Sequence, residues 1–251
     1  MATNVVIFGG ASGSSVLAGL IARGGYWLGD ETKKVAYDTY ENSALVELDV
    51  RILRDCGLDW RLGRFRNTDA RTRPDPAVVP PSIEALEALA DRVDLQDFSA
   101  FVDRCDEHEP WLWKDPRLCY TIFFWSRLFD PAKCRYVLMT RDSKQAWTGL
   151  ILRGGSSMAF DSFESMLDAN IGSVRRFGER AGVPIHELTF EDLILEPESA
   201  IRELNEFLDL ELSLSDLQAV YRGTLGRKRW SQVDFLRASF MARFKALLGR
   251  A

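Results

Sequence analysis

The chain has 251 residues, a length that suffices for one large α/β domain or at most two small ones. With 46% hydrophobic and 27% charged residues, its composition is that of an ordinary globular protein. Its formal net charge of −5 argues against a nucleic-acid-binding protein, which would carry a strong basic excess. Four widely spaced cysteines without a C-x-x-C pair, and only two histidines, argue against a zinc site and a disulfide framework.

The first predicted element is a buried parallel strand. The segment "NVVIFGG" at 4–10 is a continuous apolar run that ends in glycine, as such strands often do. Residues 1–4 lack the charged leader of a signal peptide, and glycines interrupt the apolar run well short of the roughly 18 residues of a membrane span. With cysteines expected to be reduced, these features predict a cytoplasmic protein without a membrane span.

Apolar residues at helical spacing then predict a helix from Ser14 to the Gly24-Gly25 pair and a second helix over 42–55. The segment 61–81 carries five arginines and four prolines without a period, which predicts a long loop. A third helix is expected over 82–93, capped by its first serine.

The second half of the chain alternates predicted strands and helices, without an internal repeat or a linker that would divide the chain. The expected strands are 111–116, 134–140 and 184–190. The expected helices are an aromatic one over 118–129, one that follows Arg141 and ends near Arg153, one over 161–181, one opened by Pro197, and a final amphipathic helix over 232–248.

This alternation predicts an α/β fold with a mainly parallel sheet covered by helices on both faces. In such folds the ligand lies at the carboxyl ends of the strands. Three polar clusters follow predicted strands directly, at 9–15, 114–117 and 141–143. The sequence therefore predicts a ligand site where these three clusters meet.

The first of these clusters has the pattern of a phosphate-binding turn. A glycine-serine turn that opens a helix offers backbone N–H groups and the positive end of the helix dipole to an anion. Ser12, Ser14 and Ser15 add hydroxyl donors. A Walker loop would need a lysine after the last glycine, but Gly13 is followed by two serines, which disfavours a kinase. A simple helix N-cap without a ligand is the structural alternative.

A dinucleotide-binding turn is one alternative for this segment. The sequence "GGASG" resembles the glycine-rich turn of short-chain dehydrogenases, and Asp30 lies near the expected position of a ribose-binding acid. That family also has a catalytic Tyr-x-x-x-Lys, whereas none of the six tyrosines here is followed by lysine four residues later. An NAD(P)-dependent oxidoreductase therefore stays the alternative enzyme class.

Four segments, in the same order along most of the chain, resemble motifs of PAPS-dependent sulfotransferases, in particular small bacterial-type members. PAPS is 3′-phosphoadenosine-5′-phosphosulfate. The segments are "SGSS" at 12–15, "KDPRL" at 114–118, "YVLMTRDSKQAWTGLILR" at 136–153 and "TFEDLILEPESAIRELNEFLDL" at 189–210. The resemblance implies a P-loop NTPase-like three-layer fold with a central parallel sheet of four or five strands. It also implies transfer of a sulfuryl group from PAPS to an acceptor hydroxyl without a metal, releasing adenosine 3′,5′-bisphosphate.

The resemblance also assigns donor-binding residues. Arg141 matches the arginine that binds the 3′-phosphate, and Phe190 matches an aromatic residue near the adenine. Gly149 stands where the family has a serine, so either Thr148 or Ser143 is expected to supply that hydroxyl. The remaining donor-binding residues implied are Ser12, Gly13, Ser14 and Ser15 for the 5′-phosphosulfate, and Arg227, Lys228 and Arg229 of "GRKRW" for the 3′-phosphate.

The catalytic residues match the family less closely. The family has a cation before its S-G-T motif, where this chain has Ala11, so Lys114 is the expected substitute. Family members use a histidine or a carboxylate as the general base. Glu41, which follows an aromatic residue as in the family, is one candidate, and Asp30, Glu31 and His108 are the others.

The acceptor stays open at this stage, since a carbohydrate, a lipid, a phenol or a biosynthetic intermediate all agree with the sequence. The arginine-rich loop 61–81 is a candidate lid over the acceptor. Ala11 and Gly149 also leave a non-enzyme alternative, namely a nucleotide-binding protein without catalysis.

Overall fold

The computed structural model describes residues 3–35, 37–61, 64–67, 80–153, 158–228 and 230–248. The strands are β1 (Asn4–Phe8), β2 (Thr32–Lys34), β3 (Asp38–Asn42), β4 (Leu58–Arg61), β5 (Arg64–Asn67), β6 (Leu112–Lys114), β7 (Cys134–Thr140) and β8 (Ile185–Thr189). The helices are α1 (Ser14–Ala22), α2 (Ser43–Asp55), α3 (Ile83–Leu89), α4 (Gln96–Asp106), α5 (Leu118–Trp125), the 3₁₀ helix η1 (Pro131–Lys133), α6 (Ser143–Leu152), α7 (Phe160–Ala181), α8 (Phe190–Leu195), α9 (Pro197–Leu208), α10 (Leu214–Val220) and α11 (Gln232–Leu248).

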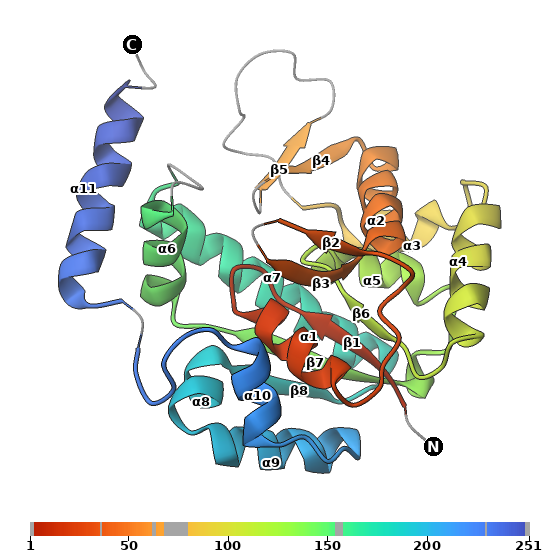
Figure 1. Cartoon of the computed structure of the whole chain (residues 1–251). Helices are drawn as coiled ribbons and strands as arrows, with labels where there is room; N and C mark the ends of the chain where they lie inside the picture. Colours follow the sequence, from red (N-terminus) through yellow and green to blue (C-terminus); the bar gives the residue numbers. More distant parts are fainter. Residues whose placement is uncertain are drawn as a thin grey trace.

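A four-stranded parallel sheet with the order β6-β1-β7-β8 forms the centre of the molecule (Figure 1). In the register of the sheet, Ile7 of β1 lies between Lys114 of β6 and Val137 of β7. The carboxyl ends of these three strands therefore meet at one edge. The predicted α/β fold with a central parallel sheet of four or five strands is confirmed, with four strands.

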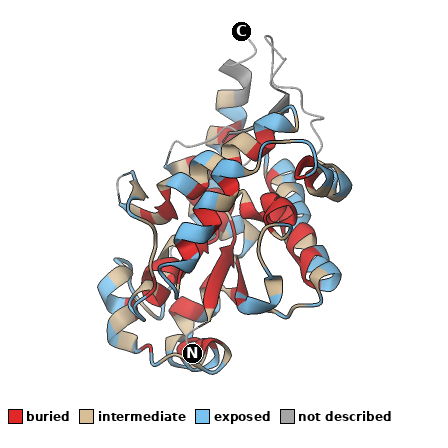
Figure 2. Ribbon diagram, turned by 90° about the vertical axis from the view of Figure 1, so that its right-hand side faces the viewer, coloured by how far each residue is buried: buried red, intermediate tan, exposed pale blue. Residues whose placement is uncertain are grey.

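Helices cover both faces of this sheet, because alternate strand residues belong to two different hydrophobic cores. Val5 and Ile7 pack with α1, α8, α9 and α10, whereas Val6 and Phe8 pack with α2 to α5 and α7. Figure 2 shows the buried residues concentrated along the strands and the inner helix faces. A third core joins α6, α7 and α11 through residues such as Trp147, Phe163 and Ala238.

The structure also corrects several sequence predictions. The predicted loop 61–81 is wrong over 64–67, where β5 pairs with β4 as an antiparallel hairpin. The predicted strand 111–116 ends at Lys114, because the Asp115 carboxylate accepts a hydrogen bond from the Arg117 N–H and the intervening proline has no N–H to donate. The hairpin β2–β3 and the helices α4, α8 and α10 were not predicted, and the predicted strand 184–190 ends at Thr189, where α8 follows.

Residues 62–63 and 68–79 lie outside the described residues, so a lid formed by this segment stays a prediction. Among the helices that the structure describes, none combines the length and the apolar character needed to cross a membrane.

Candidate active site

The turn between β1 and α1 has a backbone that only a few residue types adopt easily. Gly9, Ala11 and Gly13 have φ angles of 137°, 56° and 90°. A Cβ atom at Gly9 would lie 2.6 Å from the Met139 carbonyl oxygen, and one at Gly13 would collide with the Phe190 ring. Gly13 also supplies no side chain to cap α1, and the Val16 N–H already donates to the Gly13 carbonyl at 2.8 Å. The N–H groups of Ser14 and Ser15 are therefore the ones that the first turn presents to a ligand.

The three serines of this turn have different environments. The Ser14 hydroxyl donates a hydrogen bond to the Gly9 carbonyl at 3.1 Å, which braces the turn itself. The Ser15 hydroxyl accepts from Lys114 Nζ at 3.4 Å. The Ser12 hydroxyl is buried and has no hydrogen-bond partner within the described part of the chain. Ser12 and Ser15 are therefore the two serines placed to meet a ligand.

Lys114 and Glu41 form a buried ion pair beside this turn. Lys114 Nζ lies 2.6 Å from Glu41 Oε1, and the two side chains are only 3% and 9% exposed. Lys33 of β2 approaches the other carboxylate oxygen, with Nζ 3.6 Å from Glu41 Oε2, and is 42% exposed. Two lysines thus converge on one carboxylate next to Ser15. The sequence analysis missed Lys33, since no motif marks a lysine in a short polar hairpin.

The backbone around Glu41 explains how the carboxylate reaches Lys114. Tyr40 has a φ of 55°, and its ring packs so closely on α1 that a Cβ atom at Gly19 would lie 2.7 Å from it. The Tyr40 N–H donates to the Asp38 carboxylate, and the Asn42 side chain caps α2 by accepting from the Ala44 N–H. These contacts on both sides fix the direction of Glu41.

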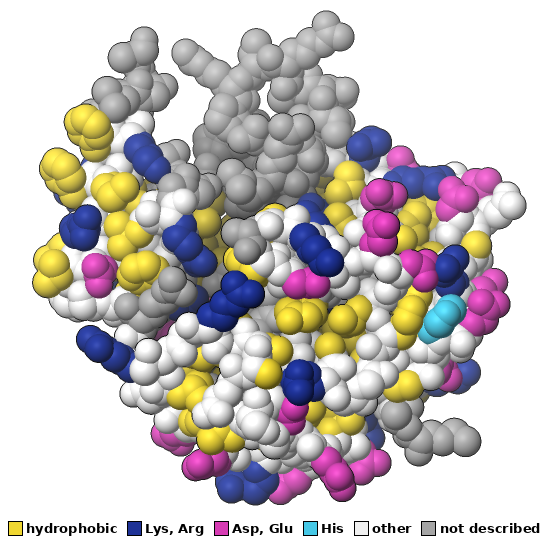
Figure 3. Space-filling model, in the orientation of Figure 1, with side chains coloured by type: hydrophobic (Ala, Val, Ile, Leu, Met, Phe, Trp, Pro, Cys, Tyr) yellow, Lys and Arg dark blue, Asp and Glu magenta, His cyan; other side chains and the backbone are white. Residues whose placement is uncertain are grey.

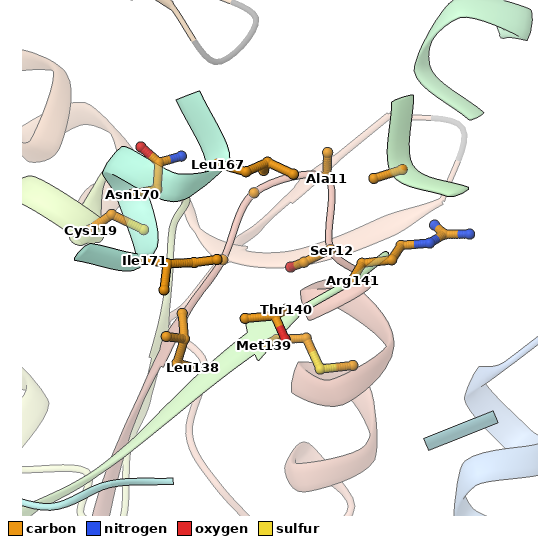
Figure 4. Close-up of a pocket in the computed structure, with 13 residues that line it drawn as sticks. Ala11, Ser12, Cys119, Leu138, Met139, Thr140, Arg141, Leu167, Asn170 and Ile171 are labelled. Carbon is orange, nitrogen blue, oxygen red and sulfur yellow. The ribbon is translucent and has the colours of Figure 1, made fainter. Parts of the chain in front are cut away.

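Arg141 lies across β1 from this ion pair, at the carboxyl end of β7. Its guanidinium carbon is 4.7 Å from the centre of the Phe190 ring, and its Nε is 3.8 Å from Glu191 Oε1. The same carboxylate accepts from the Asp142 N–H at 3.0 Å. The segments "TRD" and "FED", which are distant in the sequence, therefore meet at the edge of the sheet. Arg141, Phe190 and Ser12 come together there, as Figure 4 shows for Ser12 and Arg141.

Close neighbours of position 149 on helix α6 explain why this chain has glycine there. A Cβ atom there would lie 2.9 Å from Trp230 Nε1 and 3.1 Å from Arg153 Nη2. The Trp230 N–H donates to Gln145 Oε1 at 3.0 Å, and the Trp230 carbonyl accepts from Gln145 Nε2 at 2.7 Å. These two hydrogen bonds hold Trp230 in place. The neighbouring Thr148 is buried, and its hydroxyl has no hydrogen-bond partner among the described residues.

The other predicted bases lie away from Lys114. Asp30 is exposed and pairs with Arg104 of α4. Glu31 is also exposed, and its carbonyl accepts from the Ser43 N–H. His108 precedes β6 at its amino end, where its ring stacks on Trp27 with 4.6 Å between the ring centres. Of the four candidate bases, only Glu41 lies beside the glycine-serine turn.

The basic segment near the C-terminal helix is described in part. Arg227 and Lys228 are exposed, and Gly226 anchors this turn to α8 by donating its N–H to the Ile194 carbonyl at 2.7 Å. Arg229 lies outside the described residues. Ser143, the alternative to Thr148, uses its hydroxyl to donate to Glu164 at 2.8 Å.

Figure 4 shows a pocket beside the glycine-serine turn. It encloses about 350 Å³ together with adjoining solvent, between the turn, the end of β7 and α7. Its lining is mostly apolar, with Leu138, Leu167 and Ile171 among the lining residues. Asn170 on α7 is buried, and its carbonyl oxygen has no hydrogen-bond partner within the described residues. The sequence analysis did not identify Asn170.

Two buried carboxylates, Asp115 and Asp49, lie near the carboxyl end of β6. Asp115 is fully buried and paired with Arg117, whose Nη1 lies 3.0 and 2.9 Å from the two carboxylate oxygens. Asp49 is also fully buried and accepts from Trp125 Nε1 at 2.8 Å. Burial, and then repulsion by Asp115, raises the pKa of Asp49 well above its usual value. Burial raises the pKa of Asp115 as well, although the Arg117 guanidinium opposes this shift.

The site combines an anion cradle at a helix N-terminus, two converging lysines, one carboxylate and an arginine stacked on an aromatic ring. Such an arrangement can hold an anionic group and take up a proton beside it. Among the described residues, no group of three His, Cys, Asp or Glu side chains is arranged to hold a metal ion.

No family model and no curated protein matches this sequence. Two solved structures with a similar fold are both sulfotransferase domains. A sulfotransferase domain from the curacin biosynthetic pathway has a TM-score of 0.51 and 13% identity, over 95% of this chain and 82% of that one. A sulfotransferase domain from the Synechococcus PCC 7002 olefin synthase has a TM-score of 0.51 and 15% identity, over 97% of this chain and 94% of that one. The chain therefore has the fold of sulfotransferase domains.

Proposed function

We propose that this protein transfers a sulfuryl group from PAPS to an acceptor hydroxyl. The observation that carries the proposal is the buried pair of Lys114 and Glu41 beside Ser15, at the N-terminus of α1. A cation next to an anion cradle suits the phosphosulfate group, and a carboxylate within reach suits the hydroxyl that attacks it. The fold of the two sulfotransferase domains supports the same reaction class.

The proposed donor site extends from this pair across the end of β1. The N–H groups that open α1, with the Ser15 hydroxyl, bind the 5′-phosphosulfate. Arg141 binds the 3′-phosphate, and the Phe190 ring lies near the adenine. The buried Thr148 hydroxyl, which has no hydrogen-bond partner among the described residues, donates a hydrogen bond to a phosphate oxygen. Arg227 and Lys228 approach the 3′-phosphate from the turn that is anchored to α8.

In the proposed reaction, Lys114 Nζ turns from Glu41 to the oxygen that bridges sulfur and phosphorus. The acceptor oxygen forms a bond to sulfur while the bond between sulfur and this bridging oxygen breaks. Negative charge develops on the 5′-phosphate of the leaving adenosine 3′,5′-bisphosphate, and Lys114 stabilises it. Glu41, released from Lys114, accepts the proton of the acceptor hydroxyl.

Lys33 completes the charge balance in this proposal. The turn lacks a cation at Ala11, and Lys33 already approaches Glu41 from the side that faces solvent. It stays beside Glu41 when Lys114 turns to the donor, and so keeps the carboxylate in place before the proton transfer.

Calorimetric titration with adenosine 3′,5′-bisphosphate tests the donor site, with NAD(H) and NADP(H) titrated in parallel. We expect micromolar binding of the bisphosphate that Arg141→Ala abolishes. Arg175→Ala, which removes an exposed ion pair with Glu187, is the matched control and should bind like the wild type. Binding of a dinucleotide without binding of the bisphosphate would instead identify the turn as part of an oxidoreductase.

Ala11 and Gly149 support one second candidate, a nucleotide-binding protein without catalysis. Neither position supplies the polar group that the sulfotransferase motif has there. This candidate predicts bisphosphate binding at Arg141 but no transfer from PAPS to any acceptor.

A further inference from the structure

Helix α11 carries two apolar faces. One face packs on α6 and α7, where Ala238 and Ala242 are buried against a core that includes Trp147 and Phe163. The opposite face holds the exposed stripe, which we define as Val233, Leu236, Phe240 and Phe244. These side chains are 66%, 61%, 72% and 54% exposed, and the two phenylalanine rings stack with 6.4 Å between their centres. Their spacing of three or four residues places them on one face of the helix.

The exposed stripe is flanked by arginines on both sides. At 3.6 residues per turn, Arg237 and Arg243 lie about 60° to either side of Phe240, and both are exposed. The one acidic residue of α11, Asp234, lies in its first turn, where it accepts hydrogen bonds from the Ser231 N–H at 2.9 Å and hydroxyl at 2.7 Å. The stripe and its borders are therefore apolar and basic, although the chain as a whole has a net charge of −5.

Figure 3 shows hydrophobic side chains along the outer edge of α11, with basic side chains beside them. Figure 1 places α11 at one side of the molecule, beside α6, with its outer face directed away from the sheet. The alanines on the inner face and the contact between Trp230 and Gln145 hold the helix on α6. The stripe is therefore presented on a helix with a fixed position.

The charges on this helix argue against a second copy as the partner. A two-fold pair of these helices, whether parallel or antiparallel, would place one arginine of each copy along each of the two borders of the stripe. Like charges at such a border destabilise the pair. The same two arginines are favourable against an anionic surface, and an apolar stripe with basic borders is how interfacial helices bind lipid.

We infer that α11 binds the surface of a bilayer that contains anionic phospholipids. The exposed stripe enters the boundary between headgroups and acyl chains, and Arg237 and Arg243 contact the headgroup phosphates. With one stripe of four side chains, binding is reversible and of the strength of a single acyl anchor, with half-binding at roughly 0.1 mM accessible lipid. This inference does not depend on the proposed reaction.

Co-sedimentation of the full chain with lipid vesicles tests the inference. We expect binding to vesicles of phosphatidylcholine with phosphatidylglycerol, and binding at least about tenfold weaker to phosphatidylcholine alone or in high salt. The double variant Leu236→Ser/Phe240→Ser should bind roughly a hundredfold more weakly, since two large apolar side chains no longer enter the bilayer. Arg237→Gln/Arg243→Gln should lose the preference for the anionic lipid.

The matched control removes exposed apolar surface elsewhere. Val35 and Tyr37, on the turn between β2 and β3, are 62% and 50% exposed, and Val35→Ser/Tyr37→Ser should bind vesicles within about twofold of the wild type. Because all these side chains are exposed, each variant should keep the thermal unfolding temperature of the wild type, which circular dichroism checks.

Three results would overturn the inference. The first is no binding of the wild type to anionic vesicles, which would leave an acidic protein as the alternative partner. The second is undiminished binding by Leu236→Ser/Phe240→Ser. The third is a wild-type dimer in analytical ultracentrifugation that this double variant dissociates, which would show that a second copy covers the stripe.

Discussion

The buried pair of Lys114 and Glu41 allows a prediction that separates a structural role from a catalytic one. The two charges lie 2.6 Å apart and are almost fully withdrawn from water. Removing one partner of such a pair leaves an uncompensated buried charge and costs about 3–5 kcal/mol. We therefore expect Glu41→Leu to lower the free energy of unfolding by about that amount.

Lys114→Met should cost less, about 1–3 kcal/mol, because Lys33 remains 3.6 Å from Glu41 and is itself half exposed. The double variant Lys114→Met/Glu41→Leu removes both charges and should recover part of the loss. Urea denaturation of the four proteins measures the coupling free energy, which we expect to be about 2 kcal/mol or more. Additive effects, within about 0.5 kcal/mol, would refute the interpretation of these residues as a buried ion pair.

The same four proteins also separate stability from catalysis. If the pair serves only the fold, the stable double variant keeps full activity with PAPS and an acceptor. If Lys114 and Glu41 act in transfer, the double variant folds and binds adenosine 3′,5′-bisphosphate but loses at least about a hundredfold in rate.

Three further predictions follow from single positions. Burial raises the pKa of Asp49, so the folded chain retains a proton that the unfolded chain loses above about pH 4. The contribution of this group to stability is therefore lost as the pH rises towards the raised pKa, and Asp49→Asn should gain stability relative to the wild type as the pH rises above about 4 in urea titrations. Gly13→Ala should lower the unfolding temperature and abolish bisphosphate binding in calorimetry, since its φ of 90° strains alanine and the added methyl group meets the Phe190 ring. Gly149→Ser should destabilise the protein while Trp230 is present and much less in a Trp230→Ala background, which thermal unfolding would show; equal losses in both backgrounds would contradict the steric explanation.

The sequence contained enough information to predict the layers of the fold and one edge of the site. The apolar runs at β1 and β7 each end in a polar cluster, and the strong periodicity of α2 and α7 leaves little choice of element. Because parallel strands end at a common edge, Ser12, Lys114 and Arg141 could be assigned to one site before any geometry was known.

The rest depends on contacts between distant parts of the chain. The strand order places β6 beside β1, a pairing that no local pattern encodes. The hairpin β2–β3 is short and polar, so neither it nor Lys33 stood out, although it is this hairpin that brings Glu41 to Lys114. Asn170 lies on a helix face that periodicity assigns to the core, and only the pocket beside the turn distinguishes it.

The central claim is sulfuryl transfer, and the most direct measurement is the formation of adenosine 3′,5′-bisphosphate from PAPS in the presence of a panel of hydroxyl acceptors. Chromatography of the nucleotides should show product with the wild type for at least one acceptor. It should show at least about a hundredfold less with Lys114→Met, although this variant still binds the bisphosphate. Tight donor binding by the wild type, with no bisphosphate formed beyond that of protein-free controls for any acceptor, would contradict the account and favour a nucleotide-binding protein without catalysis.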